Sequence, residues 1–248
     1  MYTRTHIILS TLFISLSPNC LQMKYNTIMA DNINALQYAN KKVKAQEAAK
    51  QIMVDRGKLV EDTWKDVQKR EGVGKKGRPY LAYTDTKGKR TIGNGINMDA
   101  PHNEKFLRDR VSDEEYKAMY NGTMKISEAL NEEAVRYNIK LALNLAENNI
   151  QQFHTMPYEV RALSTDVFYN LGNVPKKMPK FTKALNDKDY KQASLELKYF
   201  DPSTDMNRTS GYYDDTGDRA KEHFNTLSKY PRIEKVEEEN ELIFHFED

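Results

Sequence analysis

The sequence predicts an α+β protein that is mainly α-helical, with one small β-hairpin ahead of a helical remainder. Between residues 80 and 95, "YLAYT" and "RTIGNG" flank "DTKG", a pattern typical of two short strands joined by a turn in which Gly88 has positive φ. From residue 112 onward, apolar residues recur with helical spacing. Charged residues make up 30% of the 248, a composition that favours a packed globule over disorder.

Residues 1–28 are expected to form an apolar N-terminal segment outside the folded domain. Residues 7–17 are an apolar run of about eleven, too short to span a bilayer but long enough for the core of a signal peptide. The following "SLSPNC" lacks a small-x-small cleavage site. The segment is therefore either an inefficient export signal or an extension upstream of a true start at Met23 or Met29, and no stable membrane span is expected.

Residues 29–56 are expected to form a polar helical arm. The stretch 31–56 is rich in Ala, Lys, Gln and Asn, and its apolar residues are sparse. Such a helix has only a thin apolar face, which is typical of an extension and not of a core element.

A folded domain is expected over residues 57–230. The apolar face of its first helix is made by Val60, Trp64 and Val67. Gly72 follows the last periodic residue and is a stop signal, so Glu71 is expected at the C-terminal end of this helix. In the hairpin that follows, Asp85 opens the turn and Thr91 lies on the return strand.

The remainder of the domain is expected to be helical. Ser112 and Glu115 have the spacing of a capping box. A long helix over 131–150 has an apolar face that we assign to Val135, Ile139, Leu143 and, less regularly, Leu145. The next helix runs from Pro157 to Gly172 and has a wide apolar stripe, which predicts the most buried helix of the domain.

Two short helices, separated at Asn186-Asp187, and a last helix over 216–227 complete the domain. Residues 201–212 have oxygen-bearing side chains at alternate positions but lack the glycine and the final glutamate of a calcium loop, so we interpret them as an ordinary polar loop. Residues 231–248 form an acidic C-terminal tail.

Several kinds of site are excluded by composition. Cys20 is the one cysteine, so no internal disulfide can form, and the five histidines contain no H-E-x-x-H motif. We therefore expect neither a metal nor a cofactor. The net charge of +2 is too small to argue for nucleic acid, and a single-strand binder would need stacking aromatics, for which Tyr80 and Tyr83 are the candidates.

The charge is nevertheless unevenly distributed. Residues 69–90 contain eight Lys or Arg against two acids, Glu71 and Asp85, whereas residues 231–248 contain two bases against seven acids. The basic zone would attract an anionic polymer. The two isolated carboxylates suit glycoside hydrolysis, which needs one carboxylic acid to protonate the leaving oxygen and one carboxylate on the other face of the sugar. The alternative is that Glu71 simply ends a helix and Asp85 simply starts a turn.

The order of these parts resembles the phage-type lysozymes, the muramidase family of phage T4 lysozyme. In that family a helix-end Glu is followed by Y-x-D-T-x-G-x-x-T-I-G-x-G, and the matching residues here are Tyr83, Asp85, Thr86, Gly88, Thr91, Ile92, Gly93 and Gly95. The resemblance continues, in the same order, at "VRALSTDVFYNLG", "FTKALNDKDYKQASLEL" and "TGDRAKEHF". It covers about residues 60–229 and implies a hairpin-bearing lobe and a helical lobe with a cleft between them.

The resemblance also implies roles for individual residues. Glu71 would be the general acid, and Asp85 and Thr91 would hold the attacking water, with inversion at the anomeric carbon. Arg219 matches the position whose guanidinium pairs with the catalytic Glu; its alternative is a solvent-exposed helix residue. Tyr83 and Asn94 belong to the hairpin motif and are included as supporting residues, although relatives often have an apolar residue at the position of Asn94.

The implied function is that of a peptidoglycan muramidase encoded by a bacteriophage. It would hydrolyse the β-1,4 bond between N-acetylmuramic acid and N-acetylglucosamine, either at lysis or at wall penetration during infection. Such a protein is made in the host cytoplasm, reaches the periplasm by export or within the virion, and acts on the bacterial cell wall. The arm over 29–56 favours attachment to a virion or tail assembly. The alternative is a structural virion protein that retains the fold without activity.

Overall fold

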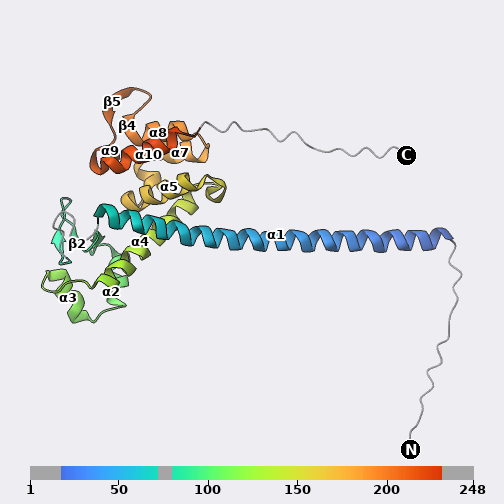
Figure 1. Cartoon of the computed structure of the whole chain (residues 1–248), viewed down its shortest axis with the longest axis horizontal. Coiled ribbons are helices and arrows are strands. Elements are labelled where there is room, and N and C mark those ends of the chain that lie inside the picture. The colour runs from blue at the N-terminus through green and yellow to red at the C-terminus, as the bar shows by residue number, and fades with distance from the viewer. Residues whose placement is uncertain (1–17, 72–79, 231–248) are drawn as a thin grey trace, which may run out of the picture. The chain divides into compact units, whose positions relative to one another are not determined.

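The computed structural model describes residues 18–71 and 80–230 (Figure 1). The apolar run of residues 7–17, the interval 72–79 and the acidic tail 231–248 lie outside the described residues. Within the described part, the chain is mainly helical with a small antiparallel sheet, which confirms the predicted α+β, mainly α class. No helix in this part is long and apolar enough to cross a bilayer.

The first element is a single long helix, α1 (Pro18–Glu71). It includes both the end of the expected N-terminal segment and the whole expected arm, so no break separates residues 28 and 29. The side chains of residues 33–50 are all exposed, as expected of a polar helix with few apolar residues. The chain divides into two compact units between Met53 and Val54, close to the expected boundary at residues 56 and 57.

In the second unit, the last part of α1 contributes core residues. Its buried apolar side chains are Leu59, Val60, Trp64 and Val67. The helix is described as far as Glu71, where the described residues pause, and Lys69 and Arg70 in its last described turn interact favourably with the negative end of the helix dipole.

A three-stranded antiparallel sheet follows, made of β1 (Tyr83–Thr84), β2 (Arg90–Ile92) and β3 (Ile96–Asn97) in that order. Tyr83 lies opposite Thr91 in the β1–β2 register. The predicted turn is present: Gly88 has φ +75°, and its N–H donates to the carbonyl of Asp85 at 3.0 Å. The short strand β3 was not predicted.

The helices of this unit are α2 (Pro101–Arg108), α3 (Asp113–Asn121), α4 (Glu128–Asn149), the 3-10 turn η2 (Phe153–Thr155), α5 (Tyr158–Leu171), α6 (Val174–Lys177), α7 (Pro179–Asn186), α8 (Tyr190–Lys198), α9 (Gly211–Thr216) and α10 (Asp218–Ser228). The capping box at Ser112 is formed, because its hydroxyl accepts from the N–H of Glu115 while the Glu115 carboxylate accepts from the N–H of Ser112. The predicted limits of α5, Pro157 and Gly172, are its two cap residues.

The core confirms most of the predicted apolar faces. Along α5, Val160, Val167 and Phe168 are buried. Along α4 the prediction was wrong at Leu145, which is 41% exposed. The buried stripe of α4 passes instead through Ala142 and Ala146, one turn apart on the same face.

The interpretation of residues 201–212 as an ordinary loop was also wrong. Most of this stretch belongs to a second antiparallel hairpin, β4 (Tyr199–Asp201) and β5 (Asp205–Thr209). The turn is stabilised by Asp201, whose Oδ1 accepts from the backbone N–H of Ser203 at 3.2 Å. No residue of either strand is fully buried, so their side chains do not alternate between apolar and polar, and the pairing by backbone hydrogen bonds leaves no pattern in the sequence.

Candidate functional site

The hairpin sheet brings Asp85 and Thr91 together. Oδ1 of Asp85 accepts two backbone N–H groups across the turn, from Lys87 at 2.9 Å and from Lys89 at 2.8 Å. These bonds orient the carboxylate so that its other oxygen, Oδ2, lies 3.5 Å from the Thr91 hydroxyl. That hydroxyl also lies 3.3 Å from the carbonyl of Lys89. The turn therefore presents a carboxylate oxygen and a hydroxyl side by side.

Glu71 is the last residue of α1, and its side chain lies outside the described part of the structure. The adjacent Arg70 shows where this helix end is attached. Its Nε donates to Oδ2 of Asp66 at 2.6 Å, and its Nη2 donates to the carboxylate of Glu222 on α10. The end of α1 is thus held against the helix that carries Arg219.

Arg219 lies in the first turn of α10 and is 5% exposed, which rules out the alternative of a solvent-exposed helix residue. Its Nη1 donates to Oδ1 of Asn170, near the end of α5. Its Nε lies 3.4 Å from Oδ2 of Asp166, one turn earlier on the same helix. The guanidinium is therefore held along two of its edges by side chains of α5.

A hollow of about 630 Å³ adjoins Arg70 and Arg219; Asp85 and Thr91 are not among its described lining residues. Basic side chains from three parts of the chain line this hollow: Arg70 at the end of α1, Lys87 in the β1–β2 turn and Arg219 on α10. Lys87 reaches across to α9, where its Nζ lies 3.7 Å from Oδ2 of Asp215. Arg70 is next to Glu71, and Lys87 is two residues from Asp85. The three chain segments that carry the expected catalytic residues therefore meet at one hollow.

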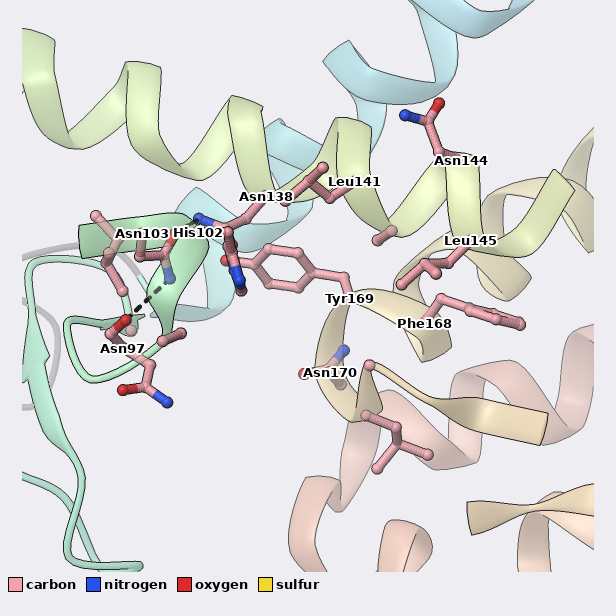
Figure 2. A pocket seen from close by; sticks show the side chains of 16 residues that line it. Asn97, His102, Asn103, Asn138, Leu141, Asn144, Leu145, Phe168, Tyr169 and Asn170 are labelled. Carbon is pink, nitrogen blue, oxygen red and sulfur yellow. Dashed lines mark hydrogen bonds between the residues drawn. The ribbon is translucent and has the colours of Figure 1, made fainter. Parts of the chain in front are cut away.

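A second hollow, of about 620 Å³, continues from the first, because both are lined by Asn170 and Leu171. Figure 2 shows the side chains of Asn97, Asn103 and Asn138 and the ring of Tyr169 at this hollow. The amides support one another: Asn138 donates to Oδ1 of Asn103 at 2.7 Å, and Asn103 donates to the carbonyl of Asn97 at 3.0 Å. The misassigned Leu145 also lines it, which accounts for its exposure.

Sequence reasoning missed most of this amide-rich wall. Isolated asparagines from β3, α2 and α4 have no common spacing, and no local pattern indicates that they share a surface. Phe168, Asn170 and Leu171 at the C-terminal end of α5 could have been proposed, because they precede the helix-ending Gly172 in a segment that had already been singled out.

Asn94 and Tyr83, the two supporting residues of the hairpin motif, lie in or beside the three-stranded sheet. Asn94 is 2% exposed, and its backbone N–H donates to Oδ1 of Asn131 on α4 at 3.0 Å. Its side chain is buried in this conformation, and its backbone attaches the sheet to α4. Tyr83 is half-buried opposite Thr91, and it is not among the described residues that line either hollow.

Behind Arg219 the domain buries a histidine and a tyrosine. Burial first, and then the positive charges of Arg219 and Arg70, lower the pKa of His223 to about 3. Burial, followed by the negative charge of Asp166, raises the pKa of the Tyr212 hydroxyl. Both side chains are therefore neutral near pH 7.

In the described part of the chain, no group of three or more His, Cys, Asp or Glu side chains is arranged to hold a metal ion. Comparison with protein-family models finds none that matches this chain, and comparison with curated proteins also finds no match. The inference of function therefore depends on the residues and their geometry.

Proposed function

We propose that this chain is a peptidoglycan muramidase that cleaves the β-1,4 bond between N-acetylmuramic acid and N-acetylglucosamine with inversion. Glu71 is the general acid, and Asp85 and Thr91 hold the attacking water. The observation that carries the proposal is the convergence of Arg70, Lys87 and Arg219 on one hollow, because these residues mark the helix end, the hairpin turn and the helix start of the lysozyme-like motif.

The chemistry of the hairpin supports the role of water activation. A water that donates to Oδ2 of Asp85 can also accept from the Thr91 hydroxyl, since these two oxygens are 3.5 Å apart. Inverting glycosidases separate their two carboxyl groups by roughly 6.5–9.5 Å to leave room for such a water. A carboxylate that is oriented by two backbone N–H groups is positioned to accept the proton of this water as it attacks.

The two hollows support the choice of a glycan as substrate. A sugar ring presents hydroxyl groups that both donate and accept hydrogen bonds, and an amide side chain offers both functions at one position. The second hollow combines several amides with the ring of Tyr169. The first hollow is lined by three cations and by three carboxylates, Asp214, Asp215 and Asp218, so its charge is balanced.

The biological setting of the proposal is the bacterial cell wall during the phage cycle, either lysis or wall penetration at infection. The protein would be made in the host cytoplasm and reach the periplasm by export or within the virion. The exposed polar helix over residues 33–50 supports attachment to a larger virion or tail assembly.

The test is digestion of purified peptidoglycan with the full chain, followed by mass analysis of the soluble fragments. The expected products carry N-acetylmuramic acid at the reducing end. The matched control is Glu71→Gln, which keeps the shape of the side chain but cannot donate the proton. Release of no soluble fragment by the wild-type chain would contradict the proposal and leave the structural virion role.

A further inference from the structure

Three buried polar side chains behind Arg219 are not used by the reaction proposed above. Asp166 lies on α5, Tyr212 on α9 and His223 on α10, and each is at most 8% exposed. Nε2 of His223 lies 3.3 Å from Oδ2 of Asp166. The Tyr212 hydroxyl lies 3.0 Å from Nδ1 of His223. The three groups form a continuous polar chain between residues far apart in the sequence.

The chemistry of the partners determines where the protons are. An ionised carboxylate can only accept, so the ring nitrogen that faces Asp166, Nε2, carries the hydrogen of the neutral His223. Nδ1 is then the acceptor, and the Tyr212 hydroxyl donates to it. The Tyr212 hydroxyl therefore donates to His223, whose Nε2 lies in close contact with Oδ2 of Asp166, 3.3 Å away.

The row of polar side chains formed by Tyr212, His223 and Asp166 ends at the guanidinium of Arg219. The same Oδ2 of Asp166 lies 3.4 Å from Nε of Arg219, while Nη1 of Arg219 donates to Asn170. Arg219 and Asn170 line the first hollow, but Asp166 and His223 are not among its described lining residues. Any effect of Asp166 and His223 on a bound substrate must therefore pass through Arg219 or through Tyr212, which also lines the hollow.

Burying a carboxylate, a histidine and a phenol together is costly unless they are paired with one another. The neutral His223 side chain lies between the Tyr212 hydroxyl and the Asp166 carboxylate, and its contact with Asp166 restrains the rotation of that carboxylate. That restraint in turn fixes the Nε edge of Arg219, whereas an apolar residue in place of His223 would leave the carboxylate free to turn.

We propose that Tyr212, His223 and Asp166 are positioning residues that hold Arg219 in the orientation needed at the hollow. This inference rests on the proposed function, because it assigns Arg219 a role in the glycoside reaction. Arg219 and Tyr212 both line the hollow, whereas Asp166 and His223 act through them.

The first test reads the hydrogen-bond direction directly and does not depend on activity. Nitrogen NMR of the full chain with labelled histidine should show the His223 ring in the Nε2–H form, with no titration between about pH 5 and pH 8. Titration of His223 near its ordinary pKa, or an Nδ1–H form, would contradict the proposed arrangement of Tyr212, His223 and Asp166.

The second test separates positioning from stability. Tyr212→Phe removes one hydroxyl and His223→Phe removes both ring nitrogens; each should lower kcat on glycan by about 10-fold or more, with KM changed by less than about 2-fold. His223→Gln, whose amide N–H can still reach Asp166, should recover part of kcat. The control is Tyr213→Phe, the same deletion at the next residue, which is expected to keep wild-type kinetics.

The outcomes distinguish this inference from the proposed function. If the wild-type chain cleaves peptidoglycan and Tyr212→Phe and His223→Phe match it in kcat, only the positioning role is wrong. A melting temperature that falls equally in His223→Phe and His223→Gln, without recovery of kcat in the latter, would assign the network to stability and overturn the proposal. If the wild-type chain cleaves no glycan, the positioning role falls with the function, while the NMR result still decides the hydrogen-bond direction.

Discussion

Replacing Gly93 with alanine tests the contact that holds the hairpin sheet against α4. Gly93 has φ +56°, and a Cβ added to it would overlap Oδ1 of Asn131 and lie 3.0 Å from its Cγ. Asn131 is buried and cannot turn away without a loss, because the same Oδ1 accepts the backbone N–H of Asn94 at 3.0 Å. Either the overlap is tolerated under strain or this hydrogen bond is broken.

The expected cost has two parts. A left-handed conformation at a residue with a Cβ costs about 1–2 kcal/mol. Forcing an extra carbon into a packed site typically costs about 1–3 kcal/mol, and leaving a buried N–H unpaired costs a similar amount. We therefore expect Gly93→Ala to lower the free energy of unfolding by about 2–5 kcal/mol.

The matched control is Gly88→Ala. Gly88 also has positive φ, at +75°, but nothing lies within 4 Å of a Cβ added there. This variant should lose only the conformational part, about 1–2 kcal/mol. Urea denaturation of both variants measures the difference, and Gly93→Ala in an Asn131→Ala background should cost no more than Gly88→Ala does. Equal costs for the two glycine variants in the wild-type background would refute the packing of Asn131 on Gly93.

Four further outcomes are expected. Glu71→Gln should reduce wall clearing by at least about 10²-fold, because the amide cannot protonate the leaving oxygen, while its thermal melt stays near wild type. Thr91→Ser should keep much of the activity and Thr91→Val should lose it; equal rates would remove the hydroxyl from the reaction. A chain that begins at Met29 should remain active on purified walls, and a folded but inactive product would contradict this. His223 has its pKa lowered from 6.5 to about 3, so the unfolded state binds more protons between these values and stability should fall as pH decreases through this window. Urea denaturation at several pH values checks this, and His223→Phe should flatten the dependence.

Local features of the structure were predictable because they depend on residues close in sequence. The turn at Gly88, the capping box at Ser112 and the limits of α5 each follow from one or two side chains and the backbone conformations they favour. The proximity of Asp85 and Thr91 was predictable for the same reason, since a short hairpin brings together residues a few positions apart.

Other features were decided only by the tertiary structure. Leu145 has helical spacing with the α4 core but is exposed at the second hollow, because it lies off the stripe that α5 covers. The β4–β5 hairpin has no fully buried residue, so its side chains do not alternate between apolar and polar and no sequence pattern indicates its pairing.

For the candidate site, the sequence by itself determined the residue types of the hairpin motif and the position of Glu71 at a helix end. It did not determine that Arg219 is buried, that Asn170 holds it, or that Asp166, Tyr212 and His223 form one chain behind it. The physical reason is that these contacts join α5 to α9 and α10, which lie tens of residues later in the chain. A hydrogen bond between distant segments depends on how the helices pack, and helix packing is set by the shared apolar core and not by the polar residues that the core brings together.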